Sequence, residues 1–161
     1  MSQKNIEIFK AISALAYAEL YDHFPRKTVI EPSKLALALG DEYWDESQLK
    51  ISENVSEYVR HKSPAGIAKP TIEWLAESGF IKYERYSDQG FLDVVLTAKG
   101  LEAIEAQENG ASNLLSAAAD LAKDELKNQA RKKLSDIFSE ILSWGIKHSP
   151  NVVQIIQSSA Q

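Results

Sequence analysis

The 161-residue sequence predicts an α+β fold in which helices dominate. Over most of the chain, apolar residues recur every three or four positions, the period of a helix that buries one face. Between these helical segments lie two runs rich in aromatic and β-branched residues, 80–86 and 91–96. They flank Ser87-Asp88-Gln89-Gly90, a typical turn sequence, so the pair predicts a β-hairpin. The chain is 44% hydrophobic, which is enough to build a core.

The N-terminal half begins with a long helix, predicted over residues 4–23 from the spacing of its apolar residues and ended by Pro25. A short strand is expected over 28–30. A second helix over 34–39 follows, opened by Pro32 at its start.

The middle of the chain carries two further helices. The first is expected from an N-cap at Ser52 to His61. Residues 63–66 read as a turn, and the next helix is expected to start near Ala68, because Pro70 fits only in a first turn. Gly79 ends this helix in a left-handed conformation. After the hairpin, Thr97 caps a helix predicted over 99–107.

Residues 109–161 are predicted to be a separate helical extension that begins with a linker at 109–112. Its helix runs to about Lys147 and is broken by Pro150, and a change in the apolar stripe predicts a break near 123–125. The main stripe falls within about an 80° arc. Such a stripe must be buried, and we expect it to pair with a second copy of the chain rather than to dock on its own domain or on a membrane. The predicted dimerisation residues are Leu126, Ala130, Leu134, Ile137, Ile141 and Trp144.

Two short segments resemble the winged helix-turn-helix superfamily. Residues 71–81, Thr-Ile-Glu-Trp-Leu-Ala-Glu-Ser-Gly-Phe-Ile, resemble the end of a recognition helix running into the first wing strand. Residues 96–100, Leu-Thr-Ala-Lys-Gly, resemble the step from the second wing strand into the closing helix. The resemblance covers roughly residues 5–108 and implies a winged-helix domain over 1–108, with residues 109–161 as the extension.

The resemblance implies sequence-specific DNA binding by a dimeric transcriptional regulator. In that family the exposed face of the recognition helix enters the major groove, and the wing tip rests near phosphates. On this sequence, Lys69, Thr71 and Glu73 would contact bases or the groove. Arg60, Lys62 and Arg85 would contact phosphates.

The charge distribution favours a rival function. Residues 1–108 contain 12 lysines and arginines against 18 aspartates and glutamates, although phosphate binding needs clustered cations. The rival is a winged helix that recognises another protein, as an inhibitor, an immunity protein or a scaffold. Its contact surface would include the acidic-aromatic loop from Asp41 to Glu46, where Tyr43 and Trp44 are typical interface residues.

Catalysis is not expected. The three histidines are far apart in the sequence, no glycine-rich phosphate loop is present, and the absence of cysteine excludes thiolate chemistry and disulfides. We therefore expect no enzyme, no cofactor and no metal. No apolar run reaches the roughly 18 residues that cross a bilayer, and the N-terminus lacks the apolar core of a signal peptide. These features predict a cytoplasmic protein without membrane contact.

Overall fold

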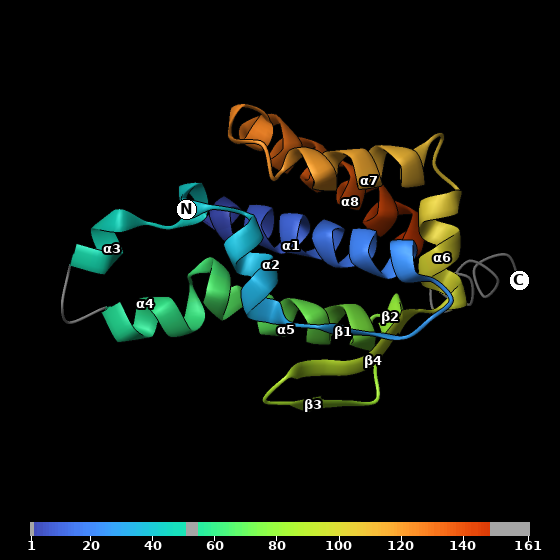
Figure 1. The fold of residues 1–161 in the computed structure, drawn as a ribbon, viewed down its shortest axis with the longest axis horizontal. Coiled ribbons are helices and arrows are strands. Elements are labelled where there is room, and N and C mark those ends of the chain that lie inside the picture. Colours follow the sequence, from blue (N-terminus) through green and yellow to red (C-terminus); the bar gives the residue numbers. More distant parts are fainter. Residues whose placement is uncertain (1, 51–54, 149–161) are drawn as a thin grey trace, which may run out of the picture.

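The computed structural model describes residues 2–50 and 55–148 (Figure 1). It is mostly helical with a small antiparallel sheet, which confirms the expected α+β class. In chain order the elements are α1 Ser2–His23, β1 Thr28–Ile30, α2 Pro32–Ala38, the 3₁₀ turn η1 Asp41–Tyr43, α3 Glu46–Lys50, α4 Val55–His61, α5 Pro64–Glu77, β2 Ile81–Lys82, β3 Arg85–Ser87, β4 Gly90–Leu96, α6 Ala98–Glu105, α7 Gly110–Asp120, the 3₁₀ turn η2 Asp124–Leu126 and α8 Lys127–Lys147.

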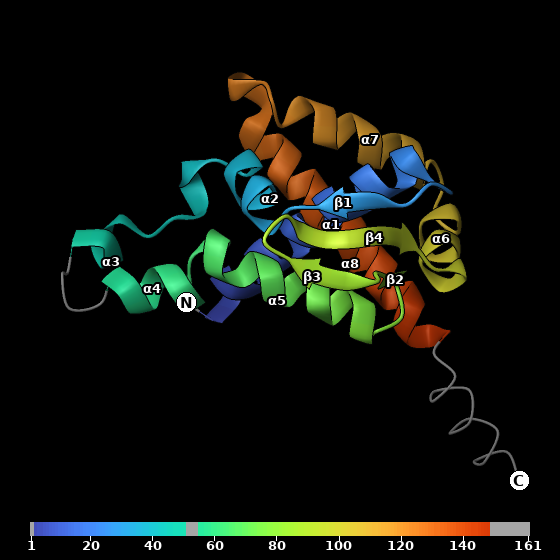
Figure 2. The ribbon, with the colours of Figure 1, turned by 60° about the horizontal axis from the view of Figure 1, so that its bottom comes forward.

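Helix α1 lies at the centre of the molecule (Figure 1). Helices α7 and α8 cover one side of it, whereas α2, α5 and the sheet lie on the other side. This position explains why α1 is buried almost throughout its middle, from Ala11 to Ala18. The unit α3–α4 extends away from this body at one end (Figure 2).

The sheet is organised around β4, which pairs antiparallel with β1, β2 and β3. Arg85 lies opposite Leu92, and Ser87 lies opposite Gly90, so β3 and β4 form the expected hairpin. The single strand predicted over 80–86 is divided in the structure into β2 and β3, which pair with different parts of β4.

Helix α5 begins earlier than the sequence predicted. Ser63 is its N-cap, because its hydroxyl accepts a hydrogen bond from the Gly66 N–H at 3.1 Å, and Pro64 occupies the first helical turn. The segment read as a turn is therefore the start of the helix, and Pro70 lies inside it. Ser52, the expected N-cap of the preceding helix, lies outside the described residues.

The junction between α5 and the sheet matches the expectation. Gly79 has φ +84°, a left-handed conformation that allows the chain to turn from the helix into β2. The Thr97 hydroxyl caps α6 by accepting from the Gly100 N–H at 3.0 Å, and it donates to the Gly79 carbonyl oxygen. Thr97 thus ties the start of α6 to the end of α5.

The C-terminal helices correct the prediction of a separate, dimerising extension. Ala130, Leu134 and Ile141 are buried within the chain, and with Leu114 they share one core with α1, α5 and the sheet. Leu126, Ile137 and Trp144 are half-buried. Ile137 and Trp144 also pack against this core, so all of the stripe except Leu126 docks on its own chain. These five residues are therefore not a free dimerisation surface. Self-association through any other surface remains a prediction.

Other features of this region agree with the sequence in part. The chain leaves the helical path between α7 and α8, close to the break expected at 123–125. The linker expected at 109–112 is wrong, because α7 begins at Gly110 and only Asn109 stands outside it. Pro150 lies outside the described residues. No described helix is long and apolar enough to cross a membrane.

Candidate binding surface

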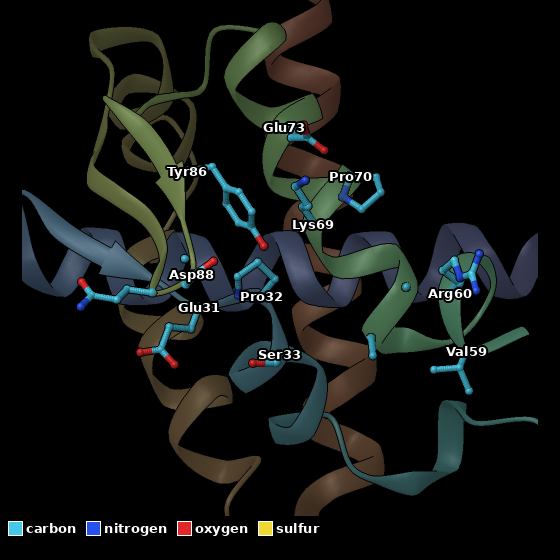
Figure 3. A pocket seen from close by; sticks show the side chains of 14 residues that line it. Glu31, Pro32, Ser33, Val59, Arg60, Lys69, Pro70, Glu73, Tyr86 and Asp88 are labelled. Atoms are coloured by element: carbon cyan, nitrogen blue, oxygen red, sulfur yellow. The ribbon is translucent and has the colours of Figure 1, made fainter. Parts of the chain in front are cut away.

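A surface pocket of about 570 Å³ lies where α2, α4, α5 and the β3–β4 turn meet (Figure 3). We call this region the α5–hairpin face. Its charged and aromatic lining comes from four separate stretches of sequence. These residues are Glu31, Arg60, Lys69, Glu73, Tyr86 and Asp88. Three of the six residues predicted to contact DNA, Arg60, Lys69 and Glu73, are therefore brought together here.

Lys69 connects the helix to the hairpin. Its ammonium nitrogen lies 4.3 Å from the centre of the Tyr86 ring, an attractive cation–π geometry. Tyr86 belongs to β3 and lies opposite Phe91 of β4, with 4.7 Å between the two ring centres. The Lys69–Tyr86 contact holds the hairpin against α5. It also engages one of the two cationic side chains of the pocket.

The electrostatic balance of the pocket is slightly acidic. Three carboxylates, on Glu31, Glu73 and Asp88, line it together with only two cations. The Glu31 carboxylate pairs with the Lys34 ammonium at 3.3 Å, an exposed pair that contributes little to stability. Carboxylates among the lining disfavour a polyanion and favour a cationic partner.

The Arg60 side chain lies at the other end of the pocket from the hairpin (Figure 3). It is exposed near the end of α4, where its guanidinium donates to the Ser56 hydroxyl at 3.0 Å. This bond stays within one helix, so the guanidinium remains available to a ligand.

The structure does not bring the other predicted contacts into the pocket. Thr71 is a correction: its side chain is buried, and its hydroxyl donates to the Ile67 carbonyl oxygen at 2.8 Å, so it cannot reach a base. Lys62 lines a different pocket with Lys4 and Tyr58. Arg85 is exposed on β3 but is not part of the lining.

Sequence reasoning missed Tyr86, Glu31 and Asp88 as members of this surface. The sequence predicted Asp88 only as part of the turn and Tyr86 only as part of a strand. Their position opposite α5 depends on how the hairpin packs, which no local pattern reports. Glu31 precedes α2 and carries no motif.

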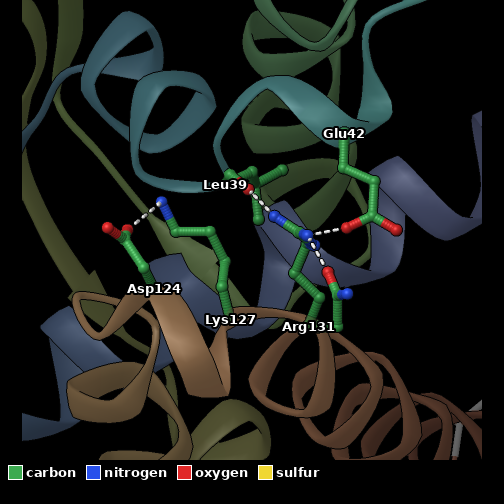
Figure 4. Close-up of polar contacts among 6 residues, drawn as sticks. Leu39, Glu42, Asp124, Lys127 and Arg131 are labelled. Atoms are coloured by element: carbon green, nitrogen blue, oxygen red, sulfur yellow. Dashed lines mark hydrogen bonds and ion pairs between the residues drawn. The ribbon is translucent and has the colours of Figure 1, made fainter.

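The acidic-aromatic loop, offered above as a contact surface for a protein partner, is largely committed to its own chain (Figure 4). The Arg131 guanidinium of α8, 4% exposed, forms an ion pair with Glu42 and donates to the Leu39 carbonyl oxygen. Trp44 packs edge-on against Tyr58, with 6.1 Å between ring centres. The loop therefore serves as a joint between the first half of the chain and α8.

Asp45 closes the same loop. Its carboxylate accepts from the Ser47 hydroxyl at 2.6 Å and from the Ser47 N–H at 3.0 Å. The hydrogen bond from the Ser47 hydroxyl lowers the pKa of Asp45 below its ordinary value. This carboxylate stabilises the start of α3 and has no free partner role.

Within residues 2–50 and 55–148, no group of three or more histidine, aspartate or glutamate side chains is arranged to hold a metal ion. Comparison of the chain with protein-family models, with curated proteins and with solved structures finds no match. The functional argument therefore depends on the α5–hairpin face itself.

Proposed function

We propose that this chain is a winged-helix protein-recognition module that binds a basic segment of another protein at the α5–hairpin face. The order of elements supports the winged-helix assignment: α1, β1, α2 and α5 are followed by a hairpin that ends in β4. In this assignment α5 corresponds to the recognition helix and the β3–β4 turn to the tip of the wing.

The observation that carries the proposal is the lining of the pocket. Three carboxylates stand against two cations, and the ammonium of Lys69 is already engaged by Tyr86. Duplex DNA presents one negative charge per about 1.7 Å of its axis, so a binding surface for DNA is expected to be strongly cationic. A segment with lysine or arginine side chains instead gains mainly from Glu73 and Asp88, because Glu31 already pairs with Lys34.

The apolar part of the pocket suits the same partner. Tyr86 is 48% exposed and Val59 is 38% exposed, and Pro32 and Pro70 line the space between them. Exposed aromatic residues are common anchors at protein interfaces. The pocket thus offers both carboxylates for the cationic groups of a peptide and apolar surface for its side-chain stems.

DNA binding is the second candidate, because Arg60 and Lys69 are exposed on α4 and α5 and Arg85 is exposed on the hairpin. The two candidates predict opposite effects of charge. Carboxylates at the pocket strengthen binding of a basic peptide and weaken binding of DNA.

The test is a charge-reversal variant, Glu73→Lys with Asp88→Lys, compared with the unchanged chain. Binding is measured by fluorescence anisotropy to three random peptide libraries of basic, neutral and acidic composition and to a random pool of duplex DNA. We expect the unchanged chain to prefer the basic library and the variant to lose that preference, by about tenfold in affinity. Glu140→Lys on α8, an exposed position that does not line the pocket, is the matched control and should leave the preference unchanged.

A different result identifies DNA as the partner. In that case the unchanged chain enriches a DNA sequence, and the charge-reversal variant binds DNA more tightly. Arg60→Ala then lowers the slope of log affinity against log salt by about one, and Lys69→Ala changes sequence preference by about 1–3 kcal/mol. Enrichment of a DNA sequence without preference for basic peptides would reject the protein-recognition proposal.

A further inference from the structure

A second pocket, of about 550 Å³, also borders α2 but lies between α1, α2 and α7. Its lining is mostly leucine and alanine, with Leu15, Leu35 and Leu115 contributed by the three helices. The charged residues of the lining are Glu19, Asp22, His23 and Lys34. Its volume lies within the range of small-molecule sites, which are mainly apolar with a few polar groups that fix orientation.

Glu19 is the unusual member of this lining. Its side chain is half-buried on α1, and its carboxylate has no hydrogen bond or ion pair with any residue that the structure describes. Burial raises the pKa of this carboxyl group above its ordinary value. A half-buried carboxylate without a hydrogen bond costs free energy, and a cationic ligand that donates one would offset that cost.

Burial has the larger effect on the pKa of Glu19, but Lys34 and His23 lie close enough to lower it, and neither side chain pairs with the carboxylate. Lys34 is paired with Glu31, on the border of the α5–hairpin face, at 3.3 Å. The His23 ring nitrogen Nδ1 lies 2.8 Å from the backbone carbonyl oxygen of Glu19, so this nitrogen donates to the backbone rather than to the carboxylate. Asp22 adds a second carboxylate to the rim of the pocket.

We infer that this pocket binds a small organic cation, a protonated amine with a compact apolar body. The ammonium group would donate to the Glu19 carboxylate, a charge-assisted hydrogen bond, while the apolar body covers the leucine and alanine side chains. Anions are disfavoured because the two carboxylates of the lining, Glu19 and Asp22, outnumber its one lysine. The site is independent of the proposed function, since it shares no lining residue with the α5–hairpin face.

The first test compares three ligands of one shape with the full chain: cyclohexylamine, cyclohexanol and cyclohexanecarboxylate. Binding is followed by NMR shifts of the leucine methyl groups and by calorimetry. We expect cyclohexylamine to bind with an affinity of about 1 mM, and the neutral and anionic analogues to bind at least about tenfold more weakly. Equal binding of the amine and the alcohol would overturn the inference, because the pocket would then select only for apolar shape.

Variants identify the site. Glu19→Gln is nearly isosteric and should weaken amine binding about tenfold without unfolding the chain, which circular dichroism checks. Ala118→Leu keeps the carboxylate but fills the pocket, and should abolish binding. Glu140→Gln removes an exposed carboxylate from α8 and should leave the affinity unchanged. Unchanged affinity in Glu19→Gln would overturn the assignment.

A second copy of the chain is the competing occupant. If a second copy covered this pocket, sedimentation would show association at the concentrations used, and amine affinity would fall as protein concentration rises. That outcome would replace the small-molecule site with a dimer interface. The charge-reversal variant at Glu73 and Asp88 should bind cyclohexylamine normally, so failure of the protein-recognition proposal leaves this test intact.

Discussion

The two sides of α1 differ in what is left uncovered. On the side of α7 and α8, the apolar stripe of α8 is enclosed by the chain itself, with Leu134 and Phe138 fully buried. On the side of α5, the helix also packs on α1, but its outer surface and the hairpin leave Lys69, Glu73 and Tyr86 around an open pocket. The comparison separates residues that build the molecule from residues that remain for a partner. Substitutions in the buried residues should therefore lower stability, whereas substitutions around the pocket should change recognition.

The largest expected effect comes from Phe138→Ala. The Phe138 ring lies 5.5 Å from that of Phe9, 6.2 Å from that of Tyr17 and 6.5 Å from that of Phe80, measured between ring centres. Removing this buried ring leaves a cavity between α8 and α1 and should cost about 3–5 kcal/mol of unfolding free energy. Urea denaturation measures the loss.

Tyr86→Ala is the matched change on the open side. Tyr86 is exposed, and its main described partners are Phe91 and the Lys69 ammonium, so its loss should cost no more than about 1 kcal/mol. A larger loss in Tyr86→Ala than in Phe138→Ala would contradict this difference between the two sides.

The order of the main elements was predictable because several of their boundaries have a local chemical cause. Pro25 follows the first helix, Gly79 turns the chain into the sheet, and Thr97 caps α6. The partner of the α8 stripe was not predictable in the same way. Periodicity reports that one face of a helix is buried, but the surface that buries it comes from α1, more than a hundred residues earlier in the chain.

The candidate surface was predicted only in part, for a related reason. Lys69 and Glu73 are four residues apart and share one face of α5, as expected. Thr71 was wrongly predicted to contact DNA. It lies three residues after Ala68 and four before Leu75, both of which are buried, so helical spacing should have placed it on the inner face. Tyr86 and Asp88 join the surface through the packing of the hairpin, which depends on contacts distant in sequence.

Arg131→Met, at the joint between α8 and the acidic loop, should lower stability less than Phe138→Ala does. The variant removes the donor to the Leu39 carbonyl oxygen and the ion pair with Glu42. We expect a loss of about 1–3 kcal/mol, because the buried carbonyl group is left without a hydrogen bond. Lys132→Met is the control in the next position: its ammonium pairs with Asp136 at 3.1 Å on an exposed surface, and its loss should cost at most about 0.5 kcal/mol. Equal losses in the two variants would mean that the joint does not hold α8 to the loop.

Gly79→Val is expected to cost about 1–2 kcal/mol, since a β-branched residue is strained at φ +84°. A Cβ atom at this position meets only the flexible Lys99 side chain, 3.7 Å away, so the expected cost comes from the backbone. Gly79→Asn provides the control, because asparagine tolerates the left-handed region better and should cost less. Thermal melts of the two variants give the comparison, and equal melting temperatures would contradict the backbone explanation.

The smallest effect concerns pH and the Asp45 carboxylate. Hydrogen bonds from Ser47 hold its folded pKa below the ordinary value, whereas the unfolded chain has the ordinary value. The folded state therefore binds fewer protons, and the stabilisation is fully present above the unfolded pKa. It is lost as pH falls through the lower, folded pKa. Ser47→Ala removes the hydroxyl donor but leaves the backbone N–H donor, so the pKa of Asp45 should rise partway toward its ordinary value. A carboxyl-carbon NMR titration of the two proteins measures the shift directly.

Because Asp45 is exposed to solvent, we expect the stability of Ser47→Ala and of the unchanged chain to converge at low pH and to differ only slightly at neutral pH. An unchanged Asp45 titration in the variant would show that the Ser47 hydroxyl does not hold the loop at the start of α3.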